Sequence, residues 1–103
     1  MIKSRTKSVQ AETLRRARSI VEQYRERLGA WQGEAAKLKA MKVTGRDVAE
    51  VAFLAPSLRT ALLAAEKELE AQVEPLGPDI AQHGLVQDIR RALRQLYREA
   101  DVL

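Results

Sequence analysis

Residues that could catalyse a reaction or bind a metal are few in this sequence of 103 residues. It has no cysteine and one histidine, His83, which follows Asp79 by four residues. Two ligands are too few for a structural zinc site, and no serine has a histidine or cysteine partner that could activate it. The glycines form no phosphate-binding loop. We therefore interpret His83 as a surface or turn residue and expect no enzymatic activity, no cofactor and no metal site.

Charged side chains, in contrast, are numerous and ordered. Lysine and arginine total 18 and aspartate and glutamate total 14, which gives a net charge of +4. Three glutamates recur at a spacing of four and therefore share one face of a helix: Glu66, Glu70 and Glu74. Arginines at the same spacing, with one neighbour, form a basic stripe: Arg90, Arg91, Arg94 and Arg98.

In a bundle whose helices run up, down and up, we expect the acidic stripe at one end and the basic stripe toward the other. The candidates for contact with an anion or with nucleic acid are Arg90, Arg91, Arg94, Arg98, Lys37, Lys39, Lys42, Arg46, Lys3, Arg5 and Lys7. Such a contact would involve the phosphate backbone and would weaken with salt. Two other interpretations stay open. The arginines form a solvated face, or they lie on the acidic stripe of a second chain in an antiparallel dimer.

These charges are positioned by helices, which the apolar periodicity predicts. From Leu14 onward, apolar residues recur at alternating steps of three and four: Leu14, Ala17, Val21, Tyr24, Leu28, Trp31, Ala35 and Leu38. A repeat of about 3.5 residues is typical of a long helix that packs lengthwise on other helices. We predict a first helix over residues 9–40, preceded by a flexible basic tail over residues 1–8.

A second helix is predicted over residues 45–74. Its apolar seam has the same steps: Val48, Val51, Ala55, Leu58, Leu62, Ala65 and Leu69. Thr44 is a good N-cap residue, and Asp47 follows it by three positions. Pro56 lies within the seam without a change of phase, which favours one helix kinked at this proline. A break at Pro56 with a fresh helix start is the alternative.

The second helix is apolar on more than one face. Phe53, Leu54 and Leu63 lie off the seam, and an amphipathic surface helix would not need them. Either this helix is central in the fold or it has a second buried surface, most simply a homodimer interface. We take these three residues as candidates for self-association.

A turn with two prolines and a glycine precedes a third helix, predicted over residues 79–101. Gly84 interrupts its first turns, which leaves room for a short separate piece before Leu85. Three long helices with short connections indicate a single all-α domain over residues 9–103. We predict an antiparallel up-down-up three-helix bundle with long, coiled-coil-like helices.

Two functions fit this pattern. The first is a non-enzymatic helical interaction protein, such as an adaptor, assembly factor or inhibitor, that forms a homodimer and binds another protein. The alternative is an accessory nucleic-acid-binding protein that contacts the DNA or RNA backbone through the basic end and the tail. The N-terminal residues do not resemble a secretory signal, and no apolar run approaches the ~20 residues of a membrane span. We therefore expect a cytoplasmic protein with no membrane partner.

Overall fold

The computed structural model describes residues 2–45 and 48–103, and this part of the chain is helical, with short turns and no strand. The all-α class predicted from the sequence is confirmed. The elements are α1 (Ile2–Thr44), α2 (Val48–Val73), the short 3₁₀ helix η1 (Glu74–Leu76), α3 (Pro78–Ala81) and α4 (Gly84–Asp101).

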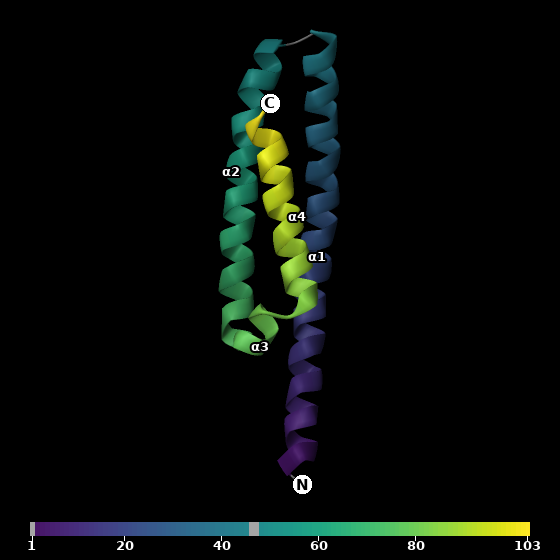
Figure 1. Ribbon diagram of the computed structural model, residues 1–103, viewed down its shortest axis with the longest axis vertical. Coiled ribbons are helices and arrows are strands. Elements are labelled where there is room, and N and C mark those ends of the chain that lie inside the picture. Colours follow the sequence, from purple (N-terminus) through teal and green to yellow (C-terminus); the bar gives the residue numbers. More distant parts are fainter. Residues whose placement is uncertain (1, 46–47) are drawn as a thin grey trace.

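The three long helices lie side by side, and each of them contacts the other two. In Figure 1, α1 ascends from the N-terminus, α2 descends beside it and α4 ascends again. The molecule measures 65 × 17 × 15 Å. A helix of 43 residues rising about 1.5 Å per residue is about as long as the longest of these dimensions. The first helix therefore sets the length of the whole molecule.

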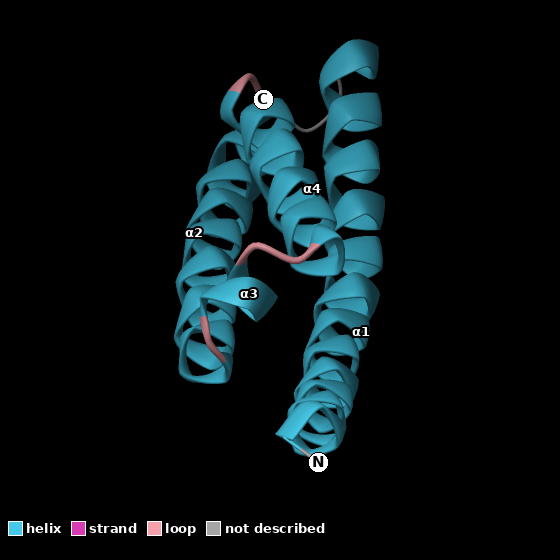
Figure 2. Cartoon of the chain, turned by 60° about the horizontal axis from the view of Figure 1, so that its bottom comes forward, coloured by secondary structure: helices cyan, strands magenta, loops and turns pink. Residues whose placement is uncertain are grey.

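The N-terminal part of α1 differs from the prediction. The helix begins at Ile2, whereas the sequence predicted a start near residue 9 after an irregular tail. Lysine, arginine and glutamine are good helix formers, and no proline or glycine precedes Gly29, so nothing in the sequence stops the helix earlier. Figures 1 and 2 show this part of α1 extending beyond the rest of the bundle.

The end of α1 also differs from the prediction. Thr44 is its last residue, and the Thr44 hydroxyl donates a hydrogen bond to the Met41 carbonyl at 3.0 Å. Gly45 follows with a φ of 70°, and its N–H donates to the Lys42 carbonyl at 3.3 Å. A glycine in this left-handed conformation is a common C-terminal stop. Thr44 therefore closes the first helix instead of capping the second, and Asp47 lies outside the described residues.

Pro56 lies inside a single continuous helix, α2. The alternative prediction, a break at Pro56 with a fresh start, is wrong. A proline in a helix interior costs about 3 kcal/mol or more, and the seam compensates because Val51, Ala55 and Leu58 are buried on both sides of it. The helix therefore keeps its register through the proline.

The predicted third helix is divided into α3 and α4, as the alternative at Gly84 allowed. His83 is exposed in the turn between them, and its Nδ1 accepts the N–H of Leu85 at 3.2 Å. This histidine therefore caps the N-terminus of α4, which confirms its interpretation as a turn residue. Gly77, with a φ of 101°, allows the chain to turn between η1 and α3.

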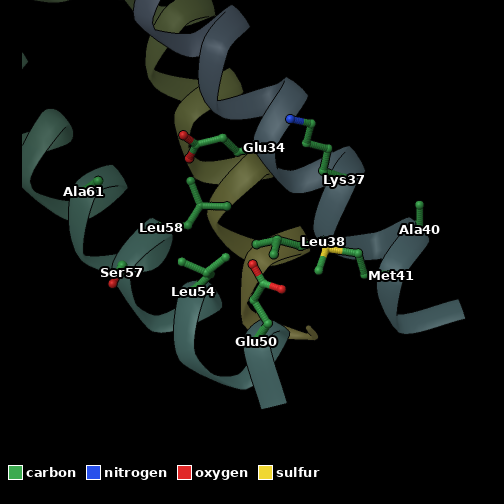
Figure 3. A pocket seen from close by; sticks show the side chains of 10 residues that line it. All are labelled: Glu34, Lys37, Leu38, Ala40, Met41, Glu50, Leu54, Ser57, Leu58 and Ala61. Atoms are coloured by element: carbon green, nitrogen blue, oxygen red, sulfur yellow. The ribbon is translucent and has the colours of Figure 1, made fainter. Parts of the chain in front are cut away.

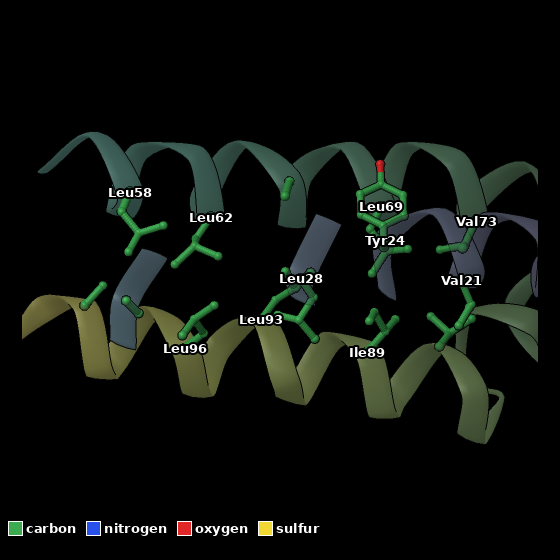
Figure 4. Close-up of a cluster of buried hydrophobic side chains, with 14 of the residues drawn as sticks. Val21, Tyr24, Leu28, Leu58, Leu62, Leu69, Val73, Ile89, Leu93 and Leu96 are labelled. Carbon is green, nitrogen blue, oxygen red and sulfur yellow. The ribbon is translucent and has the colours of Figure 1, made fainter. Parts of the chain in front are cut away.

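The core follows the predicted seams closely. Of the first seam, all positions are buried except Leu14 and Trp31, which pack against the core as half-buried residues. Figure 4 shows α2 and α4 facing each other across Leu62, Leu69 and Leu93, with Tyr24 of α1 beside Leu69. Gly29 and Gly33 lie off this seam, and a β-carbon added at either position would have no packing neighbour within 4 Å.

By length and composition, one stretch of the described chain could cross a membrane: Val48–Leu76, with a hydropathy of 1.5. Charged residues such as Glu50 and Arg59 interrupt it, which is why a search for an unbroken apolar run predicts no span there. A mostly buried core helix of a soluble protein passes the same test. Here 28% of the apolar window is buried, and Leu62 and Leu69 are among the buried residues of the stretch. The stretch by itself carries no conclusion about a membrane.

Candidate interaction surfaces

The acidic and basic stripes lie against each other within one chain. Arg94 Nε donates to Glu66 Oε1 at 2.7 Å, and Arg90 Nε donates to Glu70 Oε1 at 2.5 Å. The expectation that the stripes lie at opposite ends of the bundle is therefore wrong. The paired residues are 28 and 20 positions apart, and both pairs are centred on Ile80 in the connection. Because that connection is short, residues equally far from it on α2 and α4 meet at the same height.

Arg90 is the most enclosed member of the basic stripe. Only 13% of its side chain is exposed, and it also donates to Gln87 Oε1 at 2.9 Å and to the Ala81 carbonyl at 3.4 Å. A guanidinium with these partners fastens α4 to α2 and to the end of α3, and it has little surface left for an external anion. This residue is therefore a structural element of the bundle.

The other candidate cations are spread over several faces. Arg91 and Arg98 are exposed on α4 and line a shallow hollow with Arg94. Lys37 lines a groove between α1 and α2, and Lys39 lines a hollow between α1 and α4. Lys42 donates to the Val102 carbonyl at 2.7 Å near the end of α4. No single surface of the described chain gathers these residues.

The remaining candidates cannot be placed in this way. Arg46 lies outside the described residues. Lys3, Arg5 and Lys7 belong to the first turns of α1, where the structure describes the backbone and not the side chains.

A cluster that the sequence did not predict closes the lower part of the seam between α1 and α2. Arg27 Nη1 donates to Glu68 Oε2 at 2.8 Å, and the Tyr24 hydroxyl donates to the same oxygen at 3.4 Å. Gln72 Nε2 donates to the Tyr24 hydroxyl at 3.0 Å. The Arg27 guanidinium carbon lies 5.1 Å from the Tyr24 ring centre and 4.9 Å from the Trp31 ring centre, within the range of cation–π attraction.

The electrostatics of this cluster follow from its contacts. Burial of the Tyr24 ring, with Glu68 close to its hydroxyl, raises the pKa of this tyrosine above its usual value. The hydrogen bond and positive charge of Arg27 lower the pKa of Glu68. One sequence signal could have indicated the cluster. Tyr24, Arg27 and Trp31 are spaced by three and four on α1, and Glu68 and Gln72 are spaced by four on α2.

The three residues proposed for self-association are all exposed, but they do not share one surface. The exposed fraction is 76% for Phe53, 37% for Leu54 and 46% for Leu63. Leu54 lines the groove between α1 and α2, whereas Leu63 lines a shallow hollow beside Glu66 and Glu70. Leu54 and Leu63 are nine residues apart, and at about 100° per residue they point in opposite directions.

The groove lies in the upper part of the seam between α1 and α2. It has a volume of about 830 Å³. Figure 3 shows Leu38 and Met41 of α1 facing Leu54 and Leu58 of α2 across it. The full lining is Glu34, Lys37, Leu38, Ala40, Met41, Glu50, Leu54, Ser57, Leu58 and Ala61. The sequence did not predict this groove, because Met41 lies beyond the predicted end of the first helix.

The fold and these surfaces give a helical bundle with an apolar groove between α1 and α2 and a cluster of polar and aromatic contacts below it. Among the described residues, no group of three or more histidine, aspartate or glutamate side chains could hold a metal ion. Comparisons with protein-family models, with curated proteins and with solved structures found no match to this chain.

Proposed function

We propose that this chain is a non-enzymatic helical interaction protein of the cytoplasm that acts through protein–protein contacts as a homodimer. In this proposal its long helices form an antiparallel up-down-up bundle with coiled-coil-like packing, and the bundle presents α2 to a partner. An adaptor, an assembly factor and an inhibitor all work in this way, because each needs a rigid surface and no reactive group.

The observation that carries the proposal is the exposure of large apolar side chains on α2. Phe53 is 76% exposed, and the neighbouring stretch over residues 51–58 contains no charged residue. Exposed apolar area costs free energy, about 25 cal/mol per Å² relative to its burial. A patch of this kind beside an apolar groove is typical of a surface that another helix covers.

The alternative, an accessory protein that binds nucleic acid, has less support. It requires a basic stripe that is separate from the glutamates, but Arg90 and Arg94 are paired with Glu70 and Glu66. What still favours it is Arg91 with Arg98: both are exposed, and no ion pair among the described residues includes either of them. We therefore rank it second.

Sedimentation equilibrium over a range of protein concentrations tests the first proposal. We expect a reversible monomer–dimer equilibrium in the micromolar range or tighter. A strictly monomeric chain at every concentration would remove the homodimer and leave the exposed side chains of α2 to a different partner.

A gel-shift titration with duplex and single-stranded DNA and RNA at two salt concentrations separates the two functions. We expect no binding that weakens with salt at micromolar protein. Binding with a steep salt dependence would restore the alternative, because release of counterions accompanies phosphate contacts.

A further inference from the structure

Phe53 is not one of the groove's lining residues, but its place on α2 sets it next to several of them. Glu50 and Ser57 both line the groove from α2, and Phe53 is three residues after the first and four before the second. Residues at these spacings are neighbours on one helix face, so the phenylalanine projects beside the opening. Phe53 is 76% exposed, so the part of the chain that the structure describes leaves most of this side chain uncovered. The chain therefore presents a large apolar knob next to a large apolar hole.

The groove is suited to an aromatic side chain. Its floor is formed by Leu38 and Leu58, which are 4% exposed each, and Leu54 and Met41 form its walls. Its volume of about 830 Å³ is ample for a ring and the helix surface around it. Charges occur only at the rim, and they have both signs: Glu34 and Glu50 are acidic and Lys37 is basic. An uncharged side chain that enters the groove therefore contacts an apolar floor. The charges at the rim have both signs and largely offset each other.

We propose that a second copy of this chain occupies the groove, with Phe53 of each chain inserted into the groove of the other. The proposal rests on the homodimer of the proposed function and specifies its contact. Because knob and hole lie side by side on one helix, a single two-fold rotation satisfies both at once, which is the defining property of an isologous interface. A partner of another sequence would need both an apolar insert for the groove and a pocket of its own for Phe53, whereas a second copy supplies both.

The surroundings of Phe53 support a helix-to-helix contact between two copies of α2. Residues 51–58 carry no charge, so two such segments approach without opposing like charges. Leu54 takes part as a wall of the groove, whereas Leu63 lies on the opposite flank and stays outside the contact. The three residues proposed from the sequence therefore divide into two that belong to the interface and one that does not.

The first experiment measures the dimer dissociation constant by sedimentation equilibrium for the wild type, Phe53→Ala and Leu63→Ala. We expect Phe53→Ala to raise the constant by roughly 100-fold or more, because two buried aromatic anchors are lost per dimer. Leu63→Ala, on the same helix, should leave it within about threefold of the wild type. Both positions are exposed in the monomer, so circular dichroism and the unfolding midpoint should show that each variant stays folded.

The second experiment tests whether the knob enters the groove of the other chain. Phe53→Glu removes the knob and leaves the hole, and Ser57→Trp fills the hole and leaves the knob. Each variant alone should be monomeric at micromolar concentration. An equimolar mixture should form a heterodimer weaker than the wild type, because the open groove of the first variant accepts Phe53 of the second.

The outcomes separate this proposal from the function on which it rests. A dimeric wild type with an equally dimeric Phe53→Ala variant overturns the knob and leaves the homodimer standing. A mixture of the two complementary variants without heterodimer also overturns it. A monomeric wild type overturns both, and the groove then belongs to an amphipathic helix of a different protein.

Discussion

The seam between α1 and α2 is closed in its lower part and open in its upper part. Near Tyr24, long side chains cross from one helix to the other, and Arg27 with Glu68 covers the aromatic ring beneath. Near Leu38, the residues that flank the seam on α2 are short, Ser57 and Ala61, and a groove remains. Both parts have the same apolar periodicity. Within this molecule, the closed and open parts therefore differ in the length of the side chains that flank the seam.

The largest expected effect compares the cores under the two parts. Leu69→Ala, under the closed part, should lower the free energy of unfolding by about 3–5 kcal/mol, because its cavity cannot relax or fill with water. Leu58→Ala, at the floor of the groove, should cost about 2 kcal/mol because solvent already reaches its surroundings. Urea denaturation in a Phe53→Ala background measures both without a contribution from self-association. A larger loss at Leu58 would contradict the distinction between closed and open parts.

A smaller effect is expected when the open part is closed by a longer side chain. Ala61→Met should cover the groove of the monomer and raise its free energy of unfolding by about 0.5–1 kcal/mol. The same variant should weaken self-association, because the side chain occupies the space proposed for Phe53. The matched control is Ala64→Met, at an exposed position that does not line the groove. It should change the unfolding free energy by less than about 0.5 kcal/mol.

The smallest effect concerns the stability of the folded chain at high pH, where Tyr24 in the closed part loses its phenolic proton. The raised pKa of Tyr24 means that the folded chain holds the phenolic proton more tightly than the unfolded chain. The stability it contributes is complete below the unfolded-state pKa and is lost as the pH rises through the folded-state pKa. With Tyr97→Phe as background, phenolate absorbance reports Tyr24 alone, and its midpoint should lie above that of the chain in urea.

Glu68→Gln tests the cause of that shift. Removing the carboxylate removes a charge that raises the pKa of Tyr24, so the absorbance midpoint should fall toward the value in urea. Burial is the larger cause, so part of the elevation should remain. An unchanged midpoint would show that Glu68 does not act on the ring as the contact indicates.

The core positions could be predicted from the sequence, because burial in a helix follows local periodicity. The seam through Val21, Tyr24 and Leu28 needed only the steps of three and four. The ends of α1 were not predictable in the same way. Helix propensity permits a start at Ile2 but does not specify it. The sequence alone does not show that Gly45 has a positive φ and ends the helix.

The interaction surfaces were harder to predict, because they depend on which residues meet at one height. The pairing of Arg94 with Glu66 follows from the length of the connection around Ile80, and a general up-down-up order was too coarse to show it. The groove depends on Met41 and on short side chains from two helices together. Phe53, in contrast, could be recognised from the sequence as a large apolar residue off the seam, and the structure then showed that it is exposed and not covered by a central packing of the helix.

The ion pairs between α2 and α4 have a consequence for alignment. Both charge stripes repeat every four residues, so a slip of α4 by one helical turn would set Arg94 against Glu70 and Arg98 against Glu66. The same slip would set Arg90 against Glu74, so the shifted alignment would offer three opposite-charge pairs where the observed one has two. Coulomb attraction alone therefore does not select the observed alignment. The packing of the apolar side chains and the short connection through α3 therefore fix the alignment of α4 against α2. Lengthening that connection by one helical turn would allow α4 to slip along α2 into the alternative alignment.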